Sequence, residues 1–181
     1  MVITADKRIV LILGGARSGK SSYAQQMAAD RGGRVLFCAT AQPLDEEMRE
    51  RIRAHRKSRP PGWDTLEVGD GLAAAMEDKA GVYDTVIVDC ITLLVANCMG
   101  EATDYKAAEN AVDAELDGLI GLIQRSGCGF ILVSNEVGSG IVPDNILARV
   151  YRDALGKANQ RLARAADEVF LMTAGLPLKI K

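Results

Sequence analysis

The segment from Gly14 to Ser21 constrains the fold of this chain more than any other part of the sequence. Its residues, GGARSGKS, satisfy the pattern G-x-x-x-x-G-K-[ST]. The glycines let successive backbone N–H groups curl around phosphate oxygens, and a helix after the loop offers its positive end to the same anion. The pattern requires a strand before the loop and a helix after it, so it predicts a nucleotide-binding α/β domain.

The rest of the chain alternates between apolar runs and stretches with helical spacing. Strands are predicted at 8–13, 35–39, 65–68, 85–88, 130–133, 169–172 and 178–180, and helices after the loop up to 31, at 45–59, at 72–76, at 105–125 and from 143 onward. Solidly apolar strands belong in a sheet covered on both faces, and intervening helices imply parallel crossovers. We therefore expect one domain over residues 1–181 with a three-layer P-loop NTPase fold, a mostly parallel sheet with helices on both faces and a C-terminal hairpin strand.

Composition and charge narrow the possible partners. The net charge of −2 gives no reason to expect a nucleic-acid or membrane partner. No apolar stretch approaches the roughly 18–20 residues needed to span a bilayer, and the first residues lack the basic-then-apolar order of a signal peptide. The four cysteines form no CxxC pair, which argues against a zinc site. We expect a cytoplasmic protein.

Three side chains carry the chemistry expected of the loop. Lys20 is predicted to reach the β- and γ-phosphates of a nucleotide and Ser21 to bind Mg²⁺. Asp89 ends the apolar run 85–88, where enzymes of this fold keep a second carboxylate for Mg²⁺. Asp89 could instead cap the helix that begins near Thr92.

His55 is the only histidine in the chain. On the predicted helix 45–59 it falls in line with Met48 and Ile52, so it shares the inward edge of an otherwise charged helix. Arg53, Arg56, Lys57 and Arg59 are close to it in the sequence. An imidazole beside arginines is a plausible nucleophile for a phosphorus centre, although a structural histidine would satisfy the same spacing.

Two further segments have open interpretations. The loop 134–143 leaves a predicted strand at the carboxyl edge of the sheet, where loops usually face the ligand. Glu136 in this loop could hold a substrate group, act as a base or serve as a turn residue. Trp63 follows the Pro60-Pro61 corner and is expected to fill the core.

Together these segments resemble the bifunctional adenosylcobinamide kinase/adenosylcobinamide-phosphate guanylyltransferases of cobalamin biosynthesis, over nearly the whole chain. The phosphate-binding loop alone is generic, whereas the histidine helix and the Asn135-Glu136-Val137-Gly138 loop are specific to that family. The matching segments are 14–21, 39–41, 45–48 with Arg51, Ile52 and His55, then Trp63, Glu67, 135–138, 140–143, 159–160 and 166–169. The strand-end acid is an aspartate here and a glutamate in some relatives.

The resemblance implies two reactions and a set of site residues. A nucleoside triphosphate, ATP or GTP, phosphorylates adenosylcobinamide; GTP then transfers GMP through a histidine adduct, on His55 by match, to adenosylcobinamide phosphate, giving adenosylcobinamide-GDP and pyrophosphate. The implied nucleotide contacts are Gly14, Gly15, Ala16, Arg17, Ser18, Gly19, Lys20, Ser21, Ala39, Thr40, Ala41, Arg56, Lys57, Ser58, Arg59, Glu67 and Asp89. Relatives are homo-oligomers, trimers where that is known. The alternative is a monofunctional small-molecule kinase in which His55 is structural.

Overall fold

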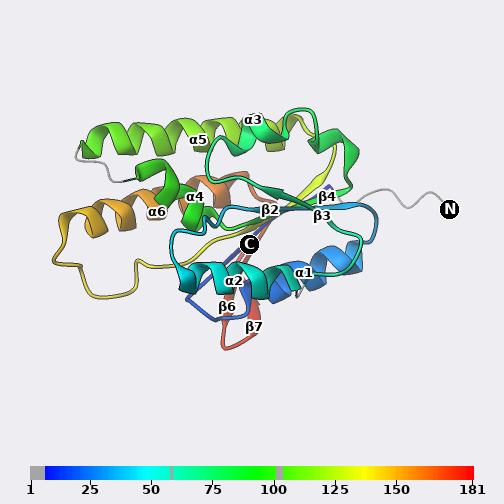
Figure 1. Cartoon of the computed structure of the whole chain (residues 1–181), viewed down its shortest axis with the longest axis horizontal. Helices are drawn as coiled ribbons and strands as arrows, with labels where there is room; N and C mark the ends of the chain where they lie inside the picture. Colours follow the sequence, from blue (N-terminus) through cyan, green and yellow to red (C-terminus); the bar gives the residue numbers. More distant parts are fainter. Residues whose placement is uncertain (1–6, 58, 101–103) are drawn as a thin grey trace.

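The computed structural model describes residues 7–57, 59–100 and 104–181. In this part of the chain, seven strands form one sheet in the order β3-β2-β4-β5-β1-β6-β7 (Figure 1). The strands are β1 (Ile9–Gly14), β2 (Val35–Ala39), β3 (Asp64–Glu67), β4 (Thr85–Asp89), β5 (Gly129–Val133), β6 (Glu168–Thr173) and β7 (Leu176–Lys179).

The sheet is parallel from β3 to β6, and β7 alone pairs antiparallel, with β6. Every residue of β2 and β5 is buried, which explains their continuous apolar sequences. The hairpin to β7 turns at Ala174 and Gly175, which both have positive φ, 51° and 83°. Its turn is therefore tighter than the predicted one, because two such residues match the twist of the paired strands.

The helices cover both faces of the sheet, as expected (Figure 1). They are α1 (Lys20–Arg31), α2 (Glu46–Lys57), α3 (Leu72–Met76), α4 (Ile91–Met99), α5 (Tyr105–Arg125) and α6 (Ile146–Ala165), with a short 3₁₀ helix, η1 (Ala80–Val82). Helices α3, α4, α5 and α6 pack in one core with the sheet face that carries Leu11 and Phe130. Helix α1 packs on the opposite face through Ala24 and Ala28.

Helix α2 and the start of α6 differ from the other elements. Helix α2 has no fully buried residue, although it contributes Met48 and Ile52 to a cavity. Helix α6 begins three residues after Pro143, because the Asn145 side chain caps it by accepting a hydrogen bond from Ala148 N (3.2 Å). The residues before Asn145 thus belong to a loop rather than to the first turn of the helix.

Within the described ranges, none of the helices is long and apolar enough to cross a membrane.

Candidate active site

The phosphate-binding loop owes its shape to two glycines. Gly14 has φ 151°, and a Cβ there would lie 2.6 Å from the carbonyl oxygen of Met172 in β6. Gly19 has φ 96°, and a Cβ there would lie 3.2 Å from Gly175 Cα in the hairpin turn. A side chain at either position would be strained, and one at Gly14 would also collide with the backbone of β6. The strand and helix that the motif requires, β1 and α1, flank the loop directly.

The Lys20 ammonium is held inside this loop. Lys20 is only 7% exposed, and its Nζ donates a hydrogen bond to the carbonyl oxygen of Gly15 at 2.6 Å. Burial lowers the pKa of the amine, while the nearby Cys90 and Asp89 oppose that shift. A cation fixed within the curl of the loop is suited to bind the phosphates that the loop surrounds.

A cavity of about 420 Å³ opens above the loop, between the carboxyl ends of β2 and β4 and helix α2. It brings together residues that are far apart in the sequence. The expected site residues that line it are Ala16, Arg17, Ser18, Gly19, Lys20, Ser21, Ala39, Ala41, His55, Arg59, Glu67 and Asp89. Cations outnumber carboxylates in this lining, which suits a triphosphate.

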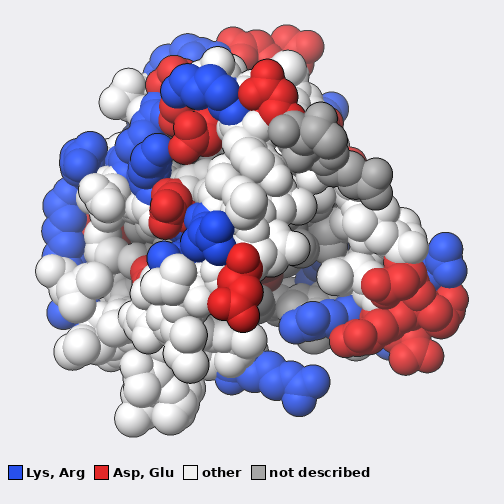
Figure 2. Space-filling view, turned by 90° about the vertical axis from the view of Figure 1, so that its left-hand side faces the viewer, with Lys and Arg blue, Asp and Glu red and all other residues white. Residues whose placement is uncertain are grey.

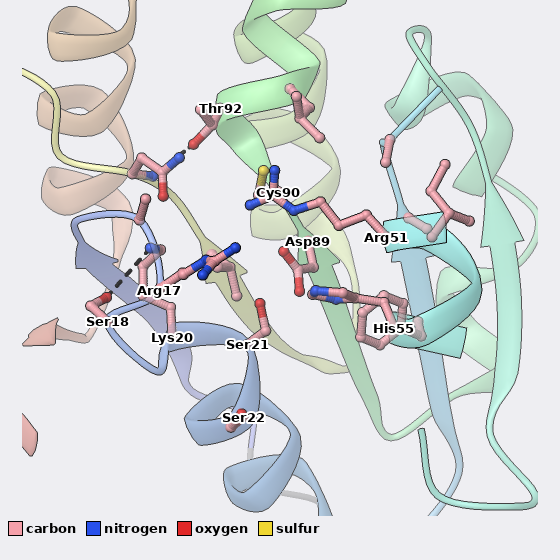
Figure 3. Close-up of a pocket in the computed structure, with 18 of the residues that line it drawn as sticks. Arg17, Ser18, Lys20, Ser21, Ser22, Arg51, His55, Asp89, Cys90 and Thr92 are labelled. Carbon is pink, nitrogen blue, oxygen red and sulfur yellow. Dashed lines mark hydrogen bonds between the residues drawn. The ribbon is translucent and has the colours of Figure 1, made fainter. Parts of the chain in front are cut away.

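Asp89 and Ser21 face each other across the cavity floor (Figure 3). Burial raises the pKa of Asp89, and a hydrogen bond from Ser21 and the charges of His55, Lys20 and Arg59 oppose the rise. The Oδ2 atom of Asp89 is buried and has no hydrogen-bond partner among the described residues. A buried carboxylate oxygen without a donor is costly unless a cation satisfies it.

Helix α2 forms the opposite wall through Met48, Arg51, Ile52 and His55. The His55 ring points toward the Asp89 carboxyl group, and Arg51 extends over the cavity toward Cys90 (Figure 3). Arg53, which neighbours His55 in sequence, instead forms an ion pair with Glu46 (3.7 Å). Arg51 belongs to the segments that carry the family resemblance but was not among the expected nucleotide contacts, although its position four residues before His55 places both on one helix face.

A second cavity, of about 640 Å³, adjoins the first through Arg59 and Glu67, which line both. Arg56 lines it too, and its Nε donates to Glu67 Oε1 at 2.7 Å, a bond that raises the pKa of Arg56. The Arg59 guanidinium stacks 4.0 Å from the centre of the Phe37 ring. Trp63 packs against the core, as expected, but is half-buried and lines this cavity.

Some of the expected contact residues lie outside both cavities. Gly14 and Gly15 shape the phosphate-binding loop without lining either space. Thr40 is fully buried behind the wall, and Lys57 is exposed and lines neither cavity. Ser58 lies outside the described residues.

The structure also adds residues that were not among the expected nucleotide contacts. Asn135 lines the first cavity with Thr92 and Cys90. Asn135 N donates to Thr92 Oγ1 (2.7 Å), which ties the start of the loop 134–143 to α4. Burial raises the pKa of the Cys90 thiol to about 11, so this sulfur is protonated at neutral pH and is a poor nucleophile.

Residues 10–180 match the sequence model of the family described as "Cobinamide kinase / cobinamide phosphate guanyltransferase". This match covers nearly the whole described sheet. The chain belongs to that family. It is 44% identical to the bifunctional adenosylcobalamin biosynthesis protein CobU of Salmonella typhimurium, with 96% of this chain and 99% of the relative covered.

Two further relatives of the family show the same extent of similarity. CobU of Escherichia coli is 41% identical over 96% of this chain and 99% of its own length. The bifunctional adenosylcobalamin biosynthesis protein CobP of Pseudomonas aeruginosa is 40% identical over 94% of this chain and 96% of its own length. The family resemblance drawn from the motifs is thereby confirmed.

Proposed function

We infer that this chain is a bifunctional enzyme that phosphorylates adenosylcobinamide and then transfers GMP from GTP to the product. Family membership supports both activities. One observation links them: His55 and the phosphate-binding loop line the same cavity. A plain kinase would not need an imidazole facing its phosphate site, so the monofunctional alternative is disfavoured.

In the kinase reaction, the loop from Gly14 to Ser21 holds the triphosphate of ATP or GTP. Lys20 neutralises charge that develops on the transferred phosphoryl group, and Arg17, which lines the same cavity, adds a second cation. The acceptor hydroxyl of adenosylcobinamide attacks the γ-phosphorus, the bond to the β-phosphate oxygen breaks, and the hydroxyl proton is released. The loop and its side chains thus supply positioning and charge stabilisation rather than covalent chemistry.

Ser21 and Asp89 fit a magnesium ion. The unpartnered Oδ2 of Asp89 and the adjacent Ser21 hydroxyl are both hard oxygen donors. No group of three or more His, Cys, Asp or Glu side chains suited to a metal occurs in the described ranges. This donor set suits Mg²⁺, which binds one or two protein oxygens together with substrate phosphates and water. When bound, the ion would neutralise charge on the phosphates.

In the guanylyl transfer, an imidazole nitrogen of His55 attacks the α-phosphorus of GTP. A P–N bond forms, the bond to the β-phosphate oxygen breaks, and pyrophosphate leaves. The phosphate oxygen of adenosylcobinamide phosphate then attacks the same phosphorus, and the P–N bond breaks to give adenosylcobinamide-GDP. Arg51 and Arg17, on opposite walls of the cavity, are placed to stabilise the negative charge of both steps (Figure 3).

The proposal also covers the binding of the guanine nucleotide and the oligomeric state of the protein. Ala39, Ala41, Arg59 and Glu67 line the cavity beyond the phosphates, where they are available to a guanine nucleotide. The homo-oligomer, a trimer by resemblance, stays a prediction. Sedimentation that shows only a monomer at micromolar concentration would exclude it.

Incubation with GTP labelled at the α-phosphate tests the inference directly. Protein-bound label that is chased into adenosylcobinamide-GDP by adenosylcobinamide phosphate supports the bifunctional enzyme. Phosphorylation of adenosylcobinamide without any protein-bound label would favour the plain kinase.

A further inference from the structure

The corrinoid substrate is too bulky for the cavity in which it must react. The cavity of about 420 Å³ has to accept a nucleoside triphosphate, and a space of this size suits a ligand no larger than a typical drug. Only the aminopropanol arm of the corrinoid can enter beside it. The macrocycle must therefore lie outside this cavity, near its mouth at the carboxyl edge of the sheet.

Two segments at this edge expose large apolar side chains. In the loop between β5 and α6, Ile141 is 97% exposed and Val142 57% exposed. On the other side, Leu44 is 79% exposed and lies between Ala41 and Met48, which both line the cavity. Single exposed apolar residues are ordinary, but several around one site mark a binding surface.

The loop that carries Ile141 and Val142 is fixed at both ends. At its start, Asn135 lines the cavity and Glu136 N donates to the carbonyl oxygen of Gly14 in the phosphate-binding loop at 3.0 Å. At its end, Arg149 Nη1 donates to the carbonyl oxygens of Pro143 (2.9 Å) and Asp144 (2.7 Å). The loop is thus anchored to the phosphate site itself and presents its apolar side chains from a held backbone.

The chemical character of this surface suits a corrin ring. No charged residue occurs between Glu136 and Asp144 in the sequence. Figure 2 views this end of the molecule and shows uncharged areas that lie among basic and acidic residues. The rim of a corrin carries methyl groups and neutral carboxamides, which pair with apolar side chains and with backbone N–H and C=O groups rather than with charges.

We propose that the loop 137–143, through Ile141 and Val142 and with Leu44 opposite, is the surface that binds the corrin macrocycle during both reactions. This inference rests on the proposed function, because it assigns the substrate's bulk to a place beside the site already described. The phosphate chemistry then takes place in the cavity, and the surface around its mouth selects the substrate.

Ile141→Ser tests the proposal, with Leu176→Ser as the matched control, since Leu176 is 72% exposed in the hairpin strand β7. We expect the KM for adenosylcobinamide to rise about tenfold in Ile141→Ser, as for the loss of one buried aliphatic side chain. Phosphorylation of N-acetyl-1-amino-2-propanol, an acceptor without the macrocycle, should proceed at the wild-type rate in both variants.

Self-guanylylation by GTP separates this proposal from the function on which it rests. If the unmodified enzyme takes up no GMP and phosphorylates no corrinoid, the proposed function fails. If it does both and Ile141→Ser keeps the wild-type KM for adenosylcobinamide, the loop 137–143 does not bind the macrocycle and the proposal is wrong. An altered sedimentation coefficient in Ile141→Ser with an unchanged KM would show that this loop contacts a second copy of the chain, which also overturns the proposal.

Discussion

The Thr40 hydroxyl brackets the backbone of Cys90, donating to its carbonyl oxygen at 2.7 Å and accepting from its N–H at 2.8 Å. Thr40 N also donates to the carbonyl oxygen of Asp89 (3.2 Å), and Asn97 Nδ2 donates to the carbonyl oxygen of Thr40 (2.8 Å). These bonds join the carboxyl ends of β2 and β4 behind the cavity. Thr40 therefore positions the Asp89 carboxyl group without touching the cavity.

Thr40→Val should destabilise the fold and weaken catalysis together. Valine keeps the shape but leaves the N–H of Cys90 without its acceptor, which costs about 1–3 kcal/mol. The carbonyl oxygen of Cys90 keeps the hydrogen bond from Leu94 N (3.1 Å). Thr40→Ser keeps the hydroxyl and should restore most of both properties. Urea unfolding and kinase assays measure the two effects, and wild-type stability in Thr40→Val would show that the bracket is dispensable.

Lys20→Ala should lower the turnover of the kinase by about 10²–10³-fold, the scale for removing one preorganised charge donor. The fold should remain, because within the described part of the chain the Lys20 amine donates to the loop atoms Gly15 O and Ser18 Oγ. Lys79→Ala, an exposed lysine near η1, is the control for charge loss. Near-normal phosphorylation of adenosylcobinamide by Lys20→Ala would remove this residue from the mechanism.

His55→Ala should abolish guanylylation of the protein and formation of adenosylcobinamide-GDP, while phosphorylation of adenosylcobinamide largely survives. The kinase reaction needs the phosphate-binding loop and a positioned hydroxyl but no covalent adduct. The adduct on the unmodified enzyme should be acid-labile and base-stable, as a P–N bond is. Since the chain has no other histidine, covalent uptake of α-labelled GMP by the variant would mean that another residue is the nucleophile.

Kinase activity should be lost as the pH falls, and the loss should begin at a higher pH than it would if Asp89 had the pKa of an ordinary aspartate. Burial raises the pKa of Asp89, so this group takes up a proton earlier as the pH falls, and its protonated form binds Mg²⁺ poorly. More Mg²⁺ should move the acid limb to lower pH, because the ion competes with the proton.

Profiles of kcat/KM against pH at two Mg²⁺ concentrations measure this competition. Asp89→Asn should lose the limb together with most activity, whereas Asp30→Asn, at an exposed position on α1, should keep both. If the acid limb of the profile stays at the same pH at both Mg²⁺ concentrations, Asp89 does not bind the ion.

Arg51→Ala should slow self-guanylylation by about 10²-fold, on the scale of one lost donor to a developing charge. Arg53→Ala removes the same side chain two positions away, where it pairs with Glu46 instead of lining the cavity. Its effect should be much smaller. Single-turnover labelling with α-labelled GTP compares the two, and equal effects would show that only the general charge of α2 matters.

The phosphate-binding loop and the strands were predictable because their causes are local. Gly14 and Gly19 serve backbone conformations that other residues resist, and the continuous apolar runs of β2 and β5 follow from burial on both faces. The start of α6 was not predictable from Pro143, because the side chain of Asn145 decides it.

The sequence by itself therefore determined the fold class and the phosphate-binding loop, since both depend on short segments with their own conformational preferences. It also determined the family, since the motifs that mark it are short segments too. Only the tertiary structure decided which of two nearby arginines lines the cavity. Arg51 and Arg53 are equally basic and lie on one helix, and their surroundings differ because α2 turns Arg51 into the cavity and Arg53 toward Glu46. Likewise, Thr40 bonds to Cys90 only because β2 and β4 pair side by side, a contact between residues 50 positions apart. Such relationships arise from packing between distant segments, which no local pattern encodes.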